Sequence, residues 1–165
     1  EFKESLDARY TRKNILKLGG LKLMNCKNGC LNENTMVIMS DGTNRRIKDL
    51  RVGNIVNGTS GENVRIENIW RGYEEELIEL KLENEKQLSI TKDHPIITNE
   101  GVVRAITIKA GDLLLTVEGY VKVVSVENIK YESNVYNLSL SDRDNTFWAE
   151  GIAVGDIEIQ NRLPF

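Results

Sequence analysis

Short apolar segments alternate with turn residues through most of the chain, from residue 30 to about residue 156. Many of the turns end in glycine, as in Asp41-Gly42 and Asn57-Gly58. This spacing is typical of strands joined by tight turns, because strands need only about four to eight residues whereas helices need more than about ten. We therefore predict an all-β fold rather than a parallel α/β fold. The predicted strands span residues 35–39, 55–56, 64–70, 76–82, 87–90, 96–98, 113–117, 120–129, 135–140, 146–149 and 152–154.

The N-terminal end follows a different pattern. Residues 5–18 are predicted to form a helix, with Ser5 as its N-cap and Gly19-Gly20 as its end. Residues 21–24 predict a short strand, and residues 45–50 a brief connection after the first hairpin. The change of pattern near residue 30 indicates a flank followed by a domain.

An internal similarity links the two halves of the β region. Residues 47–54 (IKDLRVGN) resemble residues 105–112 (AITIKAGD), since each is a short turn that ends in Gly-Asn or Gly-Asp and leads into a strand. This repeat predicts a duplicated, pseudo-symmetric β fold.

Composition and charge narrow the possible partners. A length of 165 residues fits one domain, or one domain with an appendage, and a content of 40% hydrophobic and 28% charged residues is ordinary for a soluble globular protein. With 25 acidic and 22 basic residues, the chain gives no reason to expect a nucleic-acid or membrane-surface partner. No apolar run approaches the ~20 residues that span a bilayer. The first residues lack the layout of a signal peptide, and localisation stays open.

Cysteine and histidine are scarce, with two cysteines and one histidine in the chain. Two cysteines cannot form a disulfide framework, and with a single His they make no convincing zinc site. No glycine-rich phosphate loop joins a strand to a helix. We therefore expect no metal, nucleotide or redox cofactor, and any Cys or His chemistry must use Cys26, Cys30 and His94.

The dipeptide Gly29-Cys30 suits an attack by a thiol on the peptide bond that precedes it. The Cys30 sulfur can attack the unhindered Gly29 carbonyl and move the acyl group from nitrogen to sulfur, which yields a thioester. An amide is a poor electrophile, so other groups must protonate the leaving amine and stabilise the oxyanion.

The segment Thr91-Lys92-Asp93-His94 offers this help, because a Thr and a His three residues apart before Pro95 can point into one site. His94 is then the proton donor to the Cys30 amine, and Thr91 holds the scissile peptide. The alternative is that His94 is an exposed turn residue. Asp93 is interpreted as a solvated turn residue.

Four segments in order resemble inteins and bacterial intein-like domains of the Hint (hedgehog/intein) superfamily. The resemblance covers residues 30 to about 156 and leaves no room for an inserted homing endonuclease. The matching segments are 30–37 with Asp41-Gly42, Ile47, Asp49-Leu50 and Gly53 as the opening block; 91–95 with Thr98 as the TxxH block; 105–112 as the linking segment; and 135–138 with 146–154 as the closing strands.

The resemblance implies a horseshoe-like, all-β Hint fold over residues 30–156, with an N-terminal flank over 1–29 and a C-terminal tail over 157–165. It implies that Cys30 is the nucleophile and that Thr91 and His94 activate the bond before it. The reaction would be a single-turnover, autocatalytic cleavage. Its partners would be the chain's own flanking segments, and we expect a monomer.

The C-terminal end departs from the family pattern. A splicing domain ends in His-Asn followed by Cys, Ser or Thr, but this chain has Gly155, Asp156 and Ile157. An ionised Asp is a poor cyclising group near pH 7. Asp156 and Asn137, which stands where the family often has Asp, are kept as candidate catalytic residues.

Two further positions have alternative interpretations. Asn145 matches a further family His, and Asn161 is a second residue able to cyclise, although no nucleophile follows it. The tail over 157–165 is expected to be a flank or an extra strand. Cys26 either pairs with Cys30 in a disulfide that blocks attack or is an ordinary flank cysteine.

These features leave three functional hypotheses. The first is an N-to-S acyl shift at Gly29–Cys30 followed by N-terminal cleavage without full splicing. The second is a degenerate, non-catalytic Hint module with a structural or interaction role. The third is a hedgehog-like transfer of the N-terminal flank to a small nucleophile or another acceptor.

Overall fold

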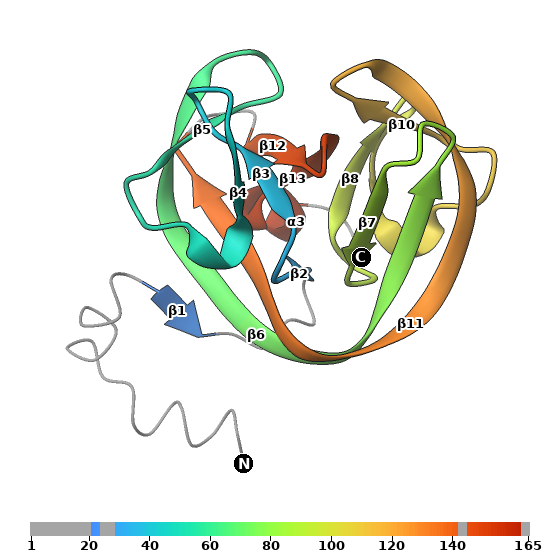
Figure 1. Cartoon of the computed structure of the whole chain (residues 1–165), viewed down its shortest axis with the longest axis horizontal. Helices are drawn as coiled ribbons and strands as arrows, with labels where there is room; N and C mark the ends of the chain where they lie inside the picture. Colours follow the sequence, from blue (N-terminus) through green and yellow to red (C-terminus); the bar gives the residue numbers. More distant parts are fainter. Residues whose placement is uncertain (1–20, 24–28, 142–144, 163–165) are drawn as a thin grey trace.

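Two long, curved strands form the base of the molecule. The structure is a computed structural model that describes residues 21–23, 29–141 and 145–162. Strands β6 (Asn63–Leu82) and β11 (Gly119–Leu140) pair antiparallel along most of their length. Figure 1 shows them as a U from which two lobes of shorter strands rise. The observed all-β horseshoe confirms the predicted fold class.

Each long strand replaces two shorter strands that the sequence predicts. The predicted breaks, near residues 71–75 and 130–134, are polar interruptions in the apolar pattern. In the structure the ladder continues through them, with a register shift between Lys130 and Ser133 where Glu132 has φ 54°. The separate strands were wrong because a β-bulge bends a strand without ending it.

The shorter strands agree with most of the remaining predictions. Three strands are additional, namely β2 (Leu31–Asn32), β4 (Asn44–Arg46) and β9 (Gly101–Arg104), and the first two are too short to show an alternating pattern. The segment predicted as a brief connection comprises the end of β4 and a 3-10 helix, η2 (Ile47–Asp49). The shorter strands are β1 (Leu21–Leu23), β2 (Leu31–Asn32), β3 (Met36–Ile38), β4 (Asn44–Arg46), β5 (Ile55–Asn57), β7 (Gln87–Ile90), β8 (Pro95–Thr98), β9 (Gly101–Arg104), β10 (Leu113–Thr116), β12 (Thr146–Ala149) and β13 (Ile152–Gly155).

The two ends of the chain differ in how they match the predictions. The strand predicted over residues 21–24 is present as β1, whereas the predicted helix over 5–18 lies outside the described residues. The tail contains a helix, α3 (Ile157–Arg162), so the expectation of an extra strand was wrong. Asp156 explains the helix, because its side chain accepts hydrogen bonds from the first free N–H groups and acts as N-cap.

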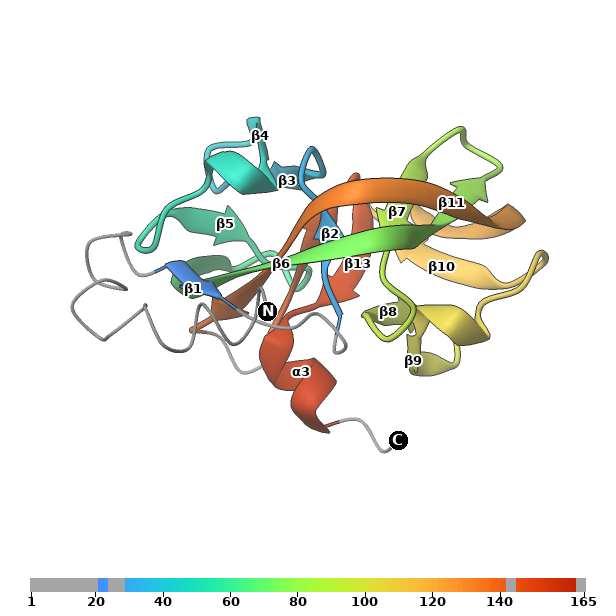
Figure 2. The same ribbon diagram turned by 90° about the horizontal axis from the view of Figure 1, so that it is seen from below.

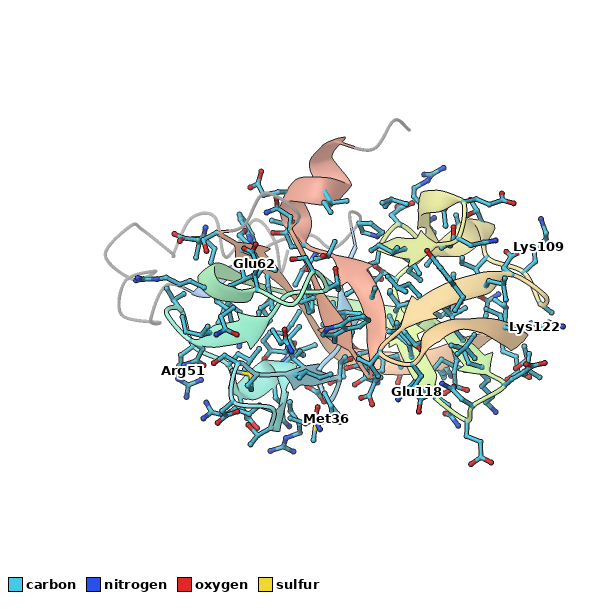
Figure 3. The ribbon with its side chains drawn as sticks, turned by 90° about the horizontal axis from the view of Figure 1, so that it is seen from above. Met36, Arg51, Glu62, Lys109, Glu118 and Lys122 are labelled. Carbon is cyan, nitrogen blue, oxygen red and sulfur yellow. The ribbon has the colours of Figure 1, made fainter. Side chains whose placement is uncertain are left out.

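The internal repeat is a structural duplication. The helices η2 and η3 (Ala105–Thr107) each lead into a turn closed by a glycine, Gly53 with φ 95° and Gly111 with φ 100°. The Asn54 side chain accepts a bond from the Arg51 N–H, and the Asp112 side chain accepts the same bond from the Lys109 N–H, each at 2.8 Å. Figure 3 shows Arg51 and Lys109 at opposite ends of the molecule, as the pseudo-symmetry requires.

The duplication extends to the turn before each 3-10 helix. The Ile47 N–H donates to the Thr35 carbonyl at 2.8 Å, and the Ala105 N–H donates to the His94 carbonyl at 2.9 Å. Thr35 therefore occupies in the first half the position of His94 in the second. The turn that holds His94 is thus one of two equivalent turns, and only this copy carries an imidazole.

Most of the buried apolar side chains in the described part of the chain form one large cluster, and Cys30 packs with Leu77 and Val135 in a second, small cluster. No helix among the described residues is both long and apolar enough to cross a membrane. The largest fully buried core side chains include Phe147, Leu31, Ile66, Leu80, Ile96, Leu138 and Ile152.

Candidate active site

Cys30 is held by two hydrogen bonds to Thr91, one from its side chain and one from its backbone. It is fully buried, its N–H donates to the Thr91 hydroxyl at 2.7 Å, and its carbonyl accepts from the Thr91 N–H at 3.0 Å. The next residue, Leu31, pairs with Ile90 of β7 on one edge and with Tyr136 of β11 on the other. These bonds fix the nitrogen of the Gly29–Cys30 peptide bond in the centre of the molecule.

Asn137 binds the other end of the same peptide bond. Its side-chain amide donates to the Gly29 carbonyl at 3.0 Å, and it is fully buried on β11. The orientation of this amide is set by its oxygen, which accepts the Leu138 N–H at 2.7 Å. Gly29 has φ 113°, a conformation that glycine adopts without strain. Both polar atoms of the peptide bond are therefore held by side chains.

His94 is fully buried, so the alternative of an exposed turn histidine was wrong. Its Nε2 lies 2.8 Å from the Gly155 carbonyl oxygen. Because a carbonyl only accepts, Nε2 must carry the proton, and in the neutral ring Nδ1 then has a free lone pair. Nδ1 is the one buried side-chain polar atom without a hydrogen-bond partner among the described residues.

Burial lowers the pKa of His94 to about 4, since the apolar surroundings disfavour the charged ring. The backbones of Gly155 and Gly29 oppose this shift because they favour the protonated ring. Near pH 7 the imidazole is therefore neutral. A proton that it gained during a reaction would lie close to carbonyl groups at both ends of the domain.

The turn that carries His94 is held by contacts with residues that follow it in the chain. The Ile106 N–H donates to the Lys92 carbonyl at 2.8 Å, and the Arg104 guanidinium pairs with the Asp93 carboxylate at 3.2 Å. Asp93 is half-buried in this ion pair rather than simply solvated. Arg104 is a positioning residue that the sequence did not reveal, because it lies 11 positions from its partner.

Asp156 is fully buried and accepts four hydrogen bonds. One oxygen accepts from the Leu140 N–H and from the Asn145 side chain, and the other accepts from the N–H groups of Glu158 and Ile159. Burial raises the pKa of the Asp156 carboxyl, while these hydrogen bonds oppose the rise. Every donor points at an oxygen, so the pocket suits a carboxylate and not a carboxamide.

Gly155 completes this arrangement next to the site. A Cβ atom at this position would lie 2.9 Å from the Ile159 side chain and 3.1 Å from that of Pro95. The glycine, where a splicing domain has His, thus makes room for helix α3. The role of Asn145 was not evident from sequence. Its side-chain amide donates to the Asp156 carboxylate oxygen that does not bind helix α3.

The sulfur of Cys30 is engaged in a disulfide. Among the described residues no cysteine is free. Cys26, the one other cysteine of the chain, lies outside the described residues. The side chain of Asn161, the other residue considered for cyclisation, is also outside them.

The site is built from polar side chains without a cluster suited to a metal. Within residues 21–23, 29–141 and 145–162 no group of three or more His, Cys, Asp or Glu side chains is placed to hold an ion. Thr91 and Asn137 each hydrogen-bond one polar atom of the Gly29–Cys30 peptide bond, and the Gly29 backbone also acts on the buried His94 ring. Asp156 follows Gly155, whose carbonyl binds His94.

Solved structures share this fold, although no protein-family model and no curated protein matches the sequence. The gp41-1 intein superposes with a TM-score of 0.70 at 21% identity, covering 78% of this chain and 98% of its own. The bacterial intein-like domain from Clostridium thermocellum gives 0.69 at 21% identity, with 77% and 98% covered. A variant of the Ssp DnaB mini-intein gives 0.67 at 16% identity, with 81% and 96% covered.

These similarities define the class of fold. The protein is built on a self-contained, horseshoe-shaped β domain of the Hint type. More particularly, it has the fold of inteins and bacterial intein-like domains, as the opening and closing sequence blocks predicted.

The buried, neutral His94 should make the protein less stable in acid. The unfolded chain takes up a proton near pH 6.5, but the folded chain resists it until about pH 4. The free energy of unfolding should therefore fall as the pH falls through this window, by about 3 kcal/mol in total from this group. Urea unfolding of Cys30→Ala, which lacks the thiol, would measure this decrease.

The matched control is Cys30→Ala with His94→Gln, which has no ring to titrate. Its stability should decrease less over the same pH range. The raised pKa of Asp156 acts in the opposite sense, adding stability on acidification, but it is common to both proteins and cancels in the difference. Parallel pH profiles for the two proteins would contradict the assignment.

Asp156→Asn should destabilise the fold even though Asn is a good N-cap. The carboxamide has one oxygen, so its NH₂ group must face either Leu140 N–H and Asn145 or the first turn of α3. We expect a loss of about 1–3 kcal/mol in unfolding free energy, measured by urea denaturation. The control is Asp112→Asn, because its pseudo-symmetric counterpart Asn54 makes the same bond naturally, and it should change stability by less than about 0.5 kcal/mol. Equal losses of stability at the two sites would contradict the conclusion that Asp156 needs two accepting oxygens.

Proposed function

We propose that the chain is a one-ended self-processing domain. Cys30 attacks the Gly29 carbonyl, forms a thioester, and the flank over residues 1–29 is then cut off without splicing. The observation that carries this proposal is that Asn137, Thr91 and His94 converge on the single Gly29–Cys30 bond. We propose the same limits for the parts as the sequence suggested, with the processing domain over 30–156 and the tail over 157–165.

The first step follows from the state of His94. Its unpartnered Nδ1 is a base that takes the proton from the Cys30 thiol. The sulfur then forms a bond to the Gly29 carbonyl carbon, and the carbonyl electron pair moves onto oxygen. The Asn137 amide, 3.0 Å from that oxygen, stabilises the negative charge.

The second step returns the proton. Thr91 accepts the Cys30 N–H and keeps the nitrogen from turning as it becomes tetrahedral. The protonated His94 gives its proton to this nitrogen. The electron pair on the oxyanion then re-forms the carbonyl as the carbon–nitrogen bond breaks, and the electron pair of the broken bond stays on the new amine. The products of the step are a thioester on Cys30 and a neutral His94 that can act again. Water or an added thiol then takes the acyl group from sulfur.

The C-terminal end does not complete splicing in this proposal. Both oxygens of Asp156 are engaged with backbone and side-chain donors, so neither is available to attack its own carbonyl. Ile157 offers no hydroxyl or thiol to accept an acyl group. The tail therefore stays joined to the domain as helix α3. A hedgehog-like transfer would share the first two steps and differ only in the acceptor.

Reduction must come before the reaction, because Cys30 is disulfide-bonded and only a thiolate is nucleophilic. We propose that Cys26 is its partner, since the chain has no third cysteine. Two thiol molecules reduce the bond, becoming one disulfide and leaving Cys26 and Cys30 as thiols. Self-processing is then confined to reducing conditions.

Dithiothreitol should release the flank from the purified chain. Mass spectrometry should detect a fragment ending at Gly29 and one beginning at Cys30, and Cys30→Ala should give neither. Asn137→Ala should slow cleavage about 10²–10³-fold, because a donor to the oxyanion is lost. The control is Asn128→Ala, an exposed residue on the same strand, which should cleave at the wild-type rate. An inert wild-type chain that stays intact would instead favour a non-catalytic Hint module.

Cys26→Ala should remove the need for a reductant. Hydroxylamine cleaves thioesters but does not reduce disulfides, so it should cut Cys26→Ala and leave the oxidised wild type intact. Adding a phosphine to the wild type should restore cleavage by hydroxylamine. If hydroxylamine alone cleaves both proteins at the same rate, Cys26 does not lock Cys30.

A further inference from the structure

Strand β6 has two edges, and they are occupied differently. One edge pairs with β11 along the length of the U. The opposite edge pairs with β5 at residues 63–65 and with β7 at residues 78–81. Between them, the single strand on this edge among the described residues is β1, which pairs in parallel with residues 69–71 (Figure 2). The segment upstream of Cys30 thus fills a gap in the edge of the domain.

The register places β1 in the same row of the sheet as Leu31, the residue that follows Cys30. Leu23 pairs with Arg71, Arg71 with Tyr136, and Tyr136 with Leu31. Neighbouring strands lie about 4.8 Å apart, so β1 and β2 are roughly 14 Å apart along this row. In the adjacent row, Lys22 pairs with Trp70, whose other partner is Asn137.

The chain therefore enters the sheet on both sides of the bond that we propose is cut. β1 holds it before residues 24–30, and β2 holds it after them. Both strands run in the same direction. β1 is parallel to β6, and β2 is antiparallel to β11, which is itself antiparallel to β6. Fixing both ends of a short connection limits the positions that Gly29 can adopt beside Asn137.

We propose that the edge of β6 at Ile69–Arg71 is a docking site for the extended segment that precedes the processed bond. The contact is a main-chain ladder, so it recognises an extended peptide backbone and not particular side chains. Its occupant is the segment Leu21–Leu23 of this chain. Docking positions the Gly29 carbonyl for the proposed acyl shift, and this consequence rests on the proposed function.

Proline substitutions on β1 test the docking directly. In parallel pairing, alternate residues face the neighbouring strand, so changing both Lys22 and Leu23 to Pro removes at least one N–H from the ladder. The matched control changes the same two residues to Ala, which keeps every N–H. Both double substitutions are made in the Cys30→Ala protein, and the hydrogen-exchange rates of the Ile69–Arg71 amides are measured.

We expect the amides within Ile69–Arg71 that face β1 to exchange at least tenfold faster in the proline protein than in the alanine protein, while those that face β11 keep their bonds. The amides of Glu79 and Leu80, which pair with both β7 and β11, should exchange alike in the two and show that the domain is folded. Equal exchange at Ile69–Arg71 in the two proteins would overturn the docking site.

The same two pairs of substitutions in the chain with Cys30 intact test the positioning role. Cleavage under reducing conditions should be about tenfold slower in the proline protein than in the alanine protein. The reason is that the Gly29 carbonyl is then held less well in the position where the Cys30 sulfur can attack it. Equal cleavage rates would overturn the positioning role. If the wild type itself does not cleave, the proposed function fails, while the exchange measurement still decides whether the segment docks.

Discussion

The antiparallel ladder between β6 and β11 is the interaction on which the rest of the structure depends. It runs from Leu82 and Val123 at one end to Ile66 and Leu140 at the other. Because β11 continues through its bulge without a break, it carries Asn137 in the middle of the molecule while its ends belong to different lobes. The remaining strands pair with this ribbon or with each other, and the two lobes rise from its arms (Figure 1).

Duplication explains how such a site arises in a symmetric frame. The turns that end at Thr35 and at His94 have the same hydrogen bonds to the following 3-10 helices. Symmetry alone therefore does not account for the buried imidazole, which only the second turn carries. Burial gives the second turn its properties, because it keeps His94 neutral and leaves one ring nitrogen without a partner in the described structure.

The two ends of the domain have different physical constraints. At the N-terminal end, side chains bind both polar atoms of one peptide bond and leave an imidazole beside it. At the C-terminal end, Gly155 and Asp156 are suited to a helix, since one lacks the Cβ that Ile159 would contact and the other caps the first turn. His94 connects the ends through its bond to the Gly155 carbonyl.

The sequence by itself determined the all-β fold, the internal repeat and the short set of residues able to do thiol chemistry, because strand length, turn glycines and residue type are local properties. It also placed Cys30, Thr91 and His94 in blocks whose order matched a known fold. Only the tertiary structure decided that interrupted apolar runs form single long strands, that Asp156 caps a helix, and that Asn137 binds Gly29. These features join residues as much as 108 positions apart, and such pairings depend on register and burial, which no local pattern specifies.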